Sequence, residues 1–133
     1  MNSESTKKYK IVLIEDDSAL AAALTEGLEQ AGFTVVLATD GEAGFRVVIE
    51  EKPDLILLDE ILPKMEGLEV HKKISERVDL AKIPVILLTN VEDPKKVSKA
   101  LEQGLRDYLI KADWSIMDII GKVKEKLAVA GKK

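Results

Sequence analysis

Acidic residues gather directly after two apolar segments of the sequence. Glu15, Asp16 and Asp17 follow one such segment, and Asp59 and Glu60 follow another. Carboxylates that are crowded together need a cation to offset their mutual repulsion. Because the sequence contains no cysteine and one histidine, the fitting ion is a hard, oxygen-loving one, and we expect Mg²⁺ as the cofactor.

Two further polar residues, Thr89 and Lys111, also follow apolar segments. Mg²⁺ keeps several waters and binds through one or two carboxylates plus a phosphate oxygen. A lysine ammonium and a threonine hydroxyl can both hold oxygens of a phosphoryl group carried on Asp59. The chemistry implied is in-line attack by the Asp59 carboxylate on an activated phosphoryl donor.

The turn after the first apolar segment argues against a nucleotide-binding site. Such a site needs a glycine-rich turn whose backbone amides face a pyrophosphate. Residues 15–17 are instead three acids without a glycine, and they would repel phosphate in the absence of a cation.

These polar residues require a scaffold that brings distant parts of the chain together. Short apolar runs alternate strictly with segments of helical periodicity, and the third such segment carries Val70, His71, Ile74 and Val78 on its predicted core face. The apolar runs are residues 11–14, 33–37, 55–58, 85–88 and 108–110.

The alternation predicts an α/β fold with a doubly wound five-stranded parallel sheet and helices on both faces. Five strands favour the flavodoxin-like order 2-1-3-4-5, in which ligands bind beyond the carboxyl ends of the strands. We therefore expect the polar residues that follow the strands to meet at one edge of the sheet.

Length and composition limit the remaining possibilities. The 133 residues correspond to one domain, which we place at 9–128 between flexible tails at 1–8 and 129–133. A formal net charge of −4 argues against direct nucleic-acid binding. The sequence shows neither a bilayer-spanning apolar run nor a signal-peptide core, so we expect a cytoplasmic protein without a membrane partner.

Five short motifs lie in order along the predicted strand ends. They are Glu15-Asp16, the segment from Pro53 to Asp59, Pro63 with Gly67, Thr89, and the segment from Tyr108 to Lys111. Together they resemble the receiver domains of two-component response regulators, and the resemblance covers roughly residues 9 to 128. Each motif alone is weak, but five in this order are highly specific.

The resemblance implies roles for the acidic residues. Asp59 looks like the phosphoacceptor, which takes its group from a phosphohistidine on a sensor histidine kinase or a phosphotransfer protein. Asp16 looks like a direct Mg²⁺ ligand, Glu15 like a ligand through water, and the backbone carbonyl of Ile61 like a further ligand beside Asp59.

The resemblance also implies a switch. Thr89 and Lys111 look like the phosphoryl-binding pair, and Tyr108 is similar to the aromatic residue that turns inward when Thr89 moves toward the phosphoryl group. Such a device is a two-state equilibrium biased by a local change of charge. It would offer a changed surface to a downstream protein target.

The sequence departs from the family pattern at several positions. Lys111 is followed by Ala112 rather than by a proline, and because a cis bond to a non-proline residue costs roughly 2.5–4 kcal/mol, we expect a trans bond. Asn90 stands where a small residue is usual. Ile61 and Val91 flank the family's route for attacking water, and since both are apolar, we expect slow self-dephosphorylation.

The leading interpretation is a single-domain response regulator, a phosphoacceptor switch rather than an enzyme acting on other substrates. One alternative is an interaction module that keeps the fold without the phosphorylation. A second is a Mg²⁺-dependent hydrolase that passes through an aspartyl phosphate, which we disfavour because Ile61 stands where such enzymes carry a general acid. Two predictions are structural: Asp17 or Ser18 caps the first helix, and His71 is a structural residue.

Overall fold

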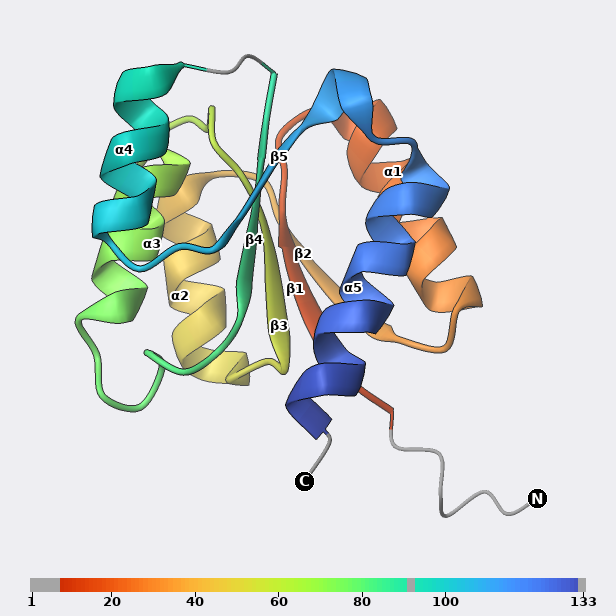
Figure 1. Ribbon diagram of the computed structural model, residues 1–133. Coiled ribbons are helices and arrows are strands. Elements are labelled where there is room, and N and C mark those ends of the chain that lie inside the picture. The colour runs from red at the N-terminus through yellow and green to blue at the C-terminus, as the bar shows by residue number, and fades with distance from the viewer. Residues whose placement is uncertain (1–7, 91–92, 132–133) are drawn as a thin grey trace.

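The computed structural model describes residues 8–90 and 93–131. Strands and helices alternate, and the strands form one parallel five-stranded sheet in the order β2-β1-β3-β4-β5 (Figure 1). The predicted fold class and strand order are therefore confirmed. The elements are β1 (Lys10–Ile14), α1 (Ser18–Gln30), β2 (Thr34–Ala38), α2 (Gly41–Glu51), β3 (Leu55–Asp59), α3 (Gly67–Ser75), β4 (Val85–Thr89), α4 (Pro94–Glu102), β5 (Asp107–Ile110), the 3-10 helix η2 (Lys111–Asp113) and α5 (Ile116–Gly131).

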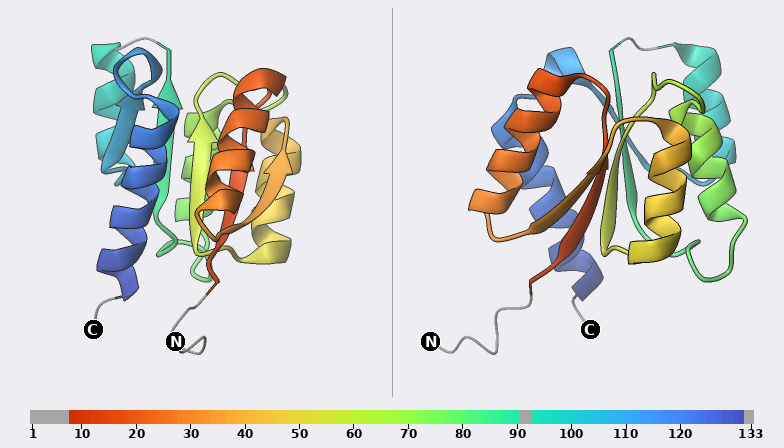
Figure 2. Two further views of the ribbon diagram at one scale, coloured as in Figure 1. Left: turned by 90° about the vertical axis from the view of Figure 1, so that its right-hand side faces the viewer. Right: turned by 180° about the vertical axis from the view of Figure 1, so that it is seen from behind.

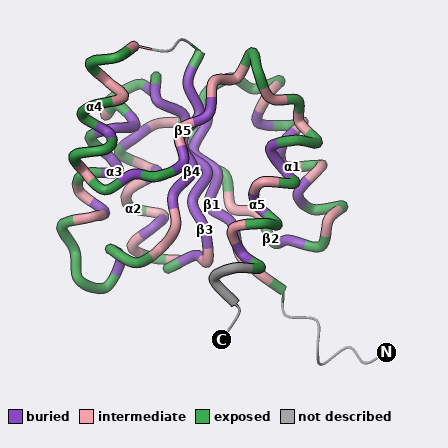
Figure 3. The backbone as a smooth tube through the Cα atoms, in the orientation of Figure 1, coloured by how far each residue is buried: buried purple, intermediate pink, exposed green. Residues whose placement is uncertain are grey.

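The sheet separates two layers of helices. Helices α2, α3 and α4 cover one face, and α1 and α5 cover the other (Figures 1 and 2). Strands β3 and β4 are buried along their whole length, which is why they consist of continuous apolar runs rather than alternating ones. Figure 3 shows this buried centre between two partly exposed layers.

Each layer encloses its own apolar core. Along β3, Ile56 and Leu58 belong to the core under α2, α3 and α4, whereas Leu55 and Leu57 belong to the core under α1 and α5. Successive side chains of a strand point to opposite faces of the sheet. The same alternation therefore fixes the direction of the polar residues that end the strands.

The third helix is shorter than predicted. It ends at Ser75, and Val78, which we placed on its core face, is 97% exposed. The chain instead turns after the helix, with a hydrogen bond from the Arg77 amide to the Ile74 carbonyl. This turn brings Leu80, which is fully buried, into the core in place of Val78.

The last helix is longer than predicted. We expected a tail from residue 129, but α5 continues to Gly131. Residues 1–7 of the predicted amino-terminal tail and the final residues 132–133 lie outside the part of the chain that the structure describes. Within that part, no helix combines the length and the apolar character that crossing a bilayer requires.

A close approach between α3 and the end of β3 depends on a glycine. A Cβ atom on Gly67 would lie 2.3 Å from the carbonyl oxygen of Asp59 and 2.8 Å from the Cα of Glu60. The Gly67 amide donates a hydrogen bond to the Glu60 carbonyl at 2.8 Å. The first turn of α3 is therefore packed directly on the backbone that carries both acids.

Candidate functional site

The polar residues predicted to meet do lie at one edge of the sheet. Glu15 directly follows β1, Asp59 ends β3, Thr89 ends β4, and Lys111 begins η2 directly after β5. Because the strands are parallel, these four positions all fall at their carboxyl ends. The topology thus assembles the site from segments that are distant in the sequence.

Three carboxylates form a group that could hold a metal ion. Each of Glu15, Asp16 and Asp59 offers an oxygen, and these oxygens lie within 4.8 Å of one another. Glu15 is fully buried and Asp59 is 4% exposed, whereas Asp16 is exposed. Oxygen ligands at this spacing suit a hard divalent cation. One oxygen of Glu15, Oε1, is buried without a hydrogen-bond partner, which also fits a site built for a cation.

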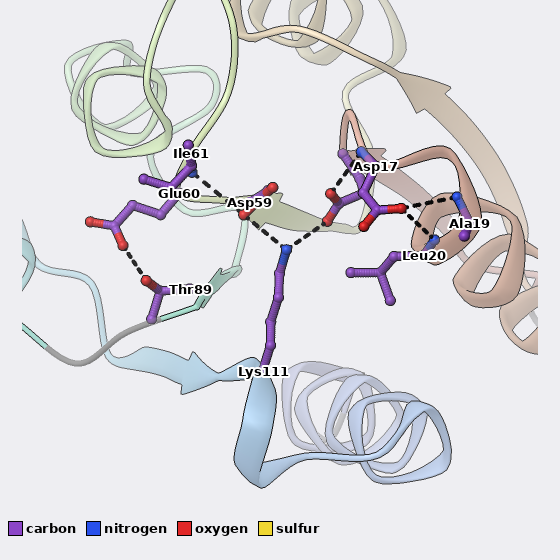
Figure 4. Close-up of polar contacts among 9 residues, drawn as sticks. Asp17, Ala19, Leu20, Asp59, Glu60, Ile61, Thr89 and Lys111 are labelled. Atoms are coloured by element: carbon purple, nitrogen blue, oxygen red, sulfur yellow. Dashed lines mark hydrogen bonds and ion pairs between the residues drawn. The ribbon is translucent and has the colours of Figure 1, made fainter.

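Lys111 supplies the positive charge beside these acids. Its Nζ lies 3.3 Å from Oδ1 of Asp59 and 3.4 Å from Oε1 of Glu15. Figure 4 shows the lysine side chain reaching up from the end of β5 toward Asp59. The ammonium group is therefore placed to offset charge on Asp59 or on a group attached to it.

Burial and a neighbouring carboxylate alter the ionisation of Glu15. The pKa of Glu15 is raised to about 7, first because the side chain is buried and next because the negative charge of Asp59 is close. A hydrogen bond from the Asp17 amide, 3.1 Å from Oε2 of Glu15, opposes the increase. A cation or a proton at this group would relieve the same repulsion.

Asp17 is not a member of the acidic group. Its Oδ1 accepts hydrogen bonds from the amides of Ala19 and Leu20 at 3.0 and 3.2 Å, and it is the N-cap of α1. Of the two predicted caps, Asp17 is therefore the one that the structure confirms, and Ser18 is the first residue of the helix. The position of Asp17 in the run of acids therefore reflects the start of the helix.

Thr89 forms a hydrogen bond with Glu60, and this pair lies away from Lys111. The hydroxyl of Thr89 donates a hydrogen bond to Oε1 of Glu60, and Figure 4 shows the Glu60 side chain turned away from Lys111 toward this hydroxyl. Glu60 is 2% exposed. We had counted Glu60 among the acids that need a cation, and that prediction is wrong.

The alternation along the strands explains this arrangement. Ile56 and Leu58 face the α2–α3–α4 core, so Glu60, two residues further, continues on that face, whereas Asp59 does not. On β4, Leu87 faces the same core, and Thr89 follows it by two residues. The period of two was thus the signal in the sequence that separates Glu60 from Asp59.

Tyr108 lies on the same side as Thr89. Its hydroxyl donates to Oε1 of Glu60 at 3.4 Å, and its ring packs against the α2–α3–α4 core. The pKa of Tyr108 is raised, mainly because the side chain is partly buried and next because of the negative charge of Glu60. Glu60 therefore joins the two residues that we predicted to form the switch.

The structure also places the other residues singled out in the sequence. The amide of Ile61 donates to Oδ1 of Asp59 at 3.4 Å, while its side chain is 51% exposed. His71 is buried, and its Nδ1 lies 3.1 Å from Oε1 of Gln103, the C-cap residue that follows α4. This contact supports the structural role predicted for His71.

The peptide bonds in the described ranges are trans, including the bond that follows Lys111. Val91 lies outside those ranges.

A doubly wound sheet in this order, with an acidic group, a lysine and a threonine at its carboxyl edge, defines the receiver class of signalling proteins. The chain belongs to the response regulator receiver domain family, whose family model matches residues 11–123. Receiver domains are the phosphoacceptor switches of two-component systems, and they interact with histidine kinases or phosphotransfer proteins.

Individual relatives agree with this assignment. The transcriptional regulatory protein AfsQ1 of Streptomyces coelicolor is 43% identical over 101 residues, which are 76% of this chain and 44% of that protein. The receiver domain of a signal transduction histidine kinase from Syntrophus aciditrophicus is 30% identical, with a TM-score of 0.85 over 94% of both chains. The BeF3-activated receiver domain of RstA from Klebsiella pneumoniae is 28% identical, with a TM-score of 0.79 over 89% of this chain and 97% of that one. The chain spans about half the length of the curated relatives it matches.

Proposed function

We propose that Asp59 is the phosphoacceptor of this receiver domain. The observation that carries the proposal is the position of Asp59 beside two other carboxylates, those of Glu15 and Asp16, and 3.3 Å from the Lys111 ammonium. A carboxylate oxygen of Asp59 attacks the phosphorus atom of the donor. The new P–O bond forms as the bond to the donor breaks, and the donor leaves with the electron pair.

We propose that Mg²⁺ is the ion for the acidic group. Glu15, Asp16 and Asp59 would hold it together with the backbone carbonyl of Ile61, and the bound ion would offset charge on the phosphoryl oxygens. Lys111, whose ammonium lies beside both Asp59 and Glu15, would offset charge on the same oxygens. The burial of Glu15 and Asp59 keeps bulk water away and strengthens these electrostatic interactions.

We propose that Thr89 and Tyr108 report the phosphorylation. In the structure both hydroxyls bind Glu60, and after phosphorylation the Thr89 hydroxyl would donate to the phosphoryl group while Tyr108 turns inward. Because Tyr108 lies on β5, beside β4 and on the side of α4, its movement changes the surface that these elements present. A protein that prefers this changed surface would be the downstream target.

The partners proposed for this chain are proteins. A histidine kinase or a phosphotransfer protein supplies the phosphoryl group, and the output is a protein contact rather than direct binding to nucleic acid. The net charge of −4 and a pI of about 5.1 support this view, since a phosphate backbone attracts basic surfaces. Catalysis is limited to the chain's own phosphorylation and dephosphorylation.

The test is phosphorylation of the purified 133-residue chain by acetyl phosphate with Mg²⁺, followed by intact mass. We expect one phosphoryl adduct that disappears in Asp59→Asn and in chelator. Asp113→Asn, which changes an exposed acid of η2 in the same way, is the matched control and keeps the adduct. Absence of any adduct would favour the phosphorylation-independent module, and many turnovers of donor would favour the hydrolase.

A further inference from the structure

Glu60 is a buried acid with several partners, none of which belongs to the acidic group. Its Oε1 accepts from the hydroxyls of Thr89 and Tyr108, and its Oε2 lies 3.4 Å from Nζ of Lys96 on α4. Oε2 is also buried without a hydrogen-bond partner. Beside it is a cavity of about 300 Å³ that Glu60, Thr89, Asn90 and Lys96 help to line. The carboxylate thus connects β4, β5 and α4 at a single point.

We propose that Glu60 is a positioning residue that holds the Thr89 hydroxyl away from Asp59, so that the phosphoryl group must compete with Glu60 for it. This inference rests on the proposed function of Asp59 and Thr89. It assigns to the residue beside the phosphoacceptor the task of setting how readily the switch responds.

The competition follows from the chemistry of a hydroxyl. Thr89 carries a single O–H donor, which can point to only one strong acceptor at a time. The carboxylate of Glu60 and a phosphoryl group on Asp59 are both charged acceptors, and hydrogen bonds to charged groups are about twice as strong as neutral ones. Moving the hydroxyl therefore exchanges one strong hydrogen bond for another. The hydrogen bond to Glu60 opposes the conformation in which Thr89 donates to the phosphoryl group.

The same exchange reaches α4. When the Thr89 hydroxyl moves to the phosphoryl group and Tyr108 turns inward, Lys96 stays beside Glu60, and a buried carboxylate that loses a donor needs its remaining partner more. Lys96 is 37% exposed in its side chain, so it has room to approach. We infer that phosphorylation tightens the contact between Glu60 and α4.

The experiment is a titration with beryllofluoride in the presence of Mg²⁺, which gives the apparent Kd of a phosphoryl analogue. Glu60→Leu removes the competing acceptor, and we expect its Kd to fall about tenfold, in line with the loss of a hydrogen bond to a charged group. Glu60→Gln keeps a weaker, neutral acceptor, and its Kd should fall by a smaller factor. Glu29→Leu, which alters an exposed acid on α1, should bind as the wild type does.

Combining Glu60→Leu with Thr89→Val tests whether Glu60 acts through the Thr89 hydroxyl, an outcome that a merely structural role would not produce. Once the hydroxyl is absent there is nothing to compete for, so Glu60→Leu should leave the Kd of the Thr89→Val protein unchanged. Circular dichroism checks that each variant is folded. If Glu60→Leu is unfolded, the Kd of Glu60→Gln tests the inference instead.

Equal Kd values for wild type, Glu60→Leu and Glu60→Gln would overturn the inference, as would an equal effect of Glu60→Leu with and without the Thr89 hydroxyl. These results are distinct from a failure of the proposed function. In that case the wild-type chain would neither bind beryllofluoride nor take a phosphoryl group from acetyl phosphate, and the inference would fall with it.

Discussion

The ammonium nitrogen of Lys111 lies 3.3 Å from Oδ1 of Asp59, the proposed phosphoacceptor. The same nitrogen lies 3.4 Å from Glu15, so one lysine serves two buried carboxylates. It occupies the region in which a divalent cation and a phosphoryl group would also have to be accommodated. Its removal should therefore affect metal binding and phosphorylation in opposite directions.

In Lys111→Met we expect tighter Mg²⁺ binding, by roughly three- to tenfold, because a positive charge that opposes the cation is gone. Phosphorylation by acetyl phosphate should slow at least about tenfold, since the charge that offsets the phosphoryl oxygens is lost. Calorimetry measures the first effect and a mass time course the second. Lys124→Met, at an exposed position of α5, is the control, and weaker Mg²⁺ binding in Lys111→Met would contradict the prediction.

Glu15 should make the metal-free protein less stable as the pH rises. Its pKa in the folded protein, about 7, is above its usual value of 4.5, so folding favours the protonated form. That contribution to stability is complete below the unfolded pKa and is lost as the pH rises through the folded one. From about pH 5 to about pH 7.5, the Tm without Mg²⁺ should fall by several degrees more in wild type than in Glu15→Gln.

The control for this comparison is Glu125→Gln on α5, whose side chain is 67% exposed. Its Tm should follow that of the wild type across the same pH range. A wild-type profile parallel to that of Glu15→Gln would contradict the assignment of the pH dependence to Glu15.

Ile61 should lengthen the life of the phosphorylated form. Its side chain is 51% exposed beside Asp59, and an apolar group cannot orient an attacking water. Replacement by asparagine, which can hold a water through hydrogen bonds, should shorten the half-life of the adduct by about threefold or more. Loss of the adduct is followed by intact mass after the donor is removed. Ile61→Val keeps the position apolar and should leave the half-life unchanged; equal half-lives in all three proteins would refute the idea.

Gly67 should be more sensitive to alanine than Gly121. A Cβ at Gly67 would lie 2.3 Å from a backbone carbonyl oxygen at the end of β3, whereas one at Gly121 meets no atom within 4 Å. Gly67→Ala should be destabilised by about 1–3 kcal/mol because the backbone must shift. Gly121→Ala should be stabilised by about 0.5–1 kcal/mol because alanine favours the helix. Urea unfolding measures both, and equal changes would contradict the packing described here.

The sequence allowed the sheet order and the meeting of the acids to be predicted, because strict alternation of strands and helices leaves few topologies. It did not fix where α3 ends. Val78 fits the helical period, but the turn after Ser75 buries Leu80 instead, and such a choice depends on the tertiary fit of one side chain. Helix ends are decided by packing more than by periodicity.

The direction of Glu60 was missed for a different reason. We grouped it with Asp59 because the two are adjacent, although adjacent residues on a strand point to opposite sides. The hydrogen bond between Glu60 and Thr89 joins the residue that follows β3 to the last residue of β4, so its prediction required both the pleat and the register. The gathering of these residues at one edge of the sheet could thus be predicted from the sequence, whereas their pairing depends on the three-dimensional structure.

The separation of the interior into two cores has an evolutionary consequence. Substitutions in elements that do not touch usually have additive effects, and the cores under α1 and α5 and under α2, α3 and α4 are divided by the sheet. Descendants of this chain can therefore vary the two layers separately. One layer can adapt to a new partner while the other preserves an old one, and the carboxyl edge of the sheet between them need not change.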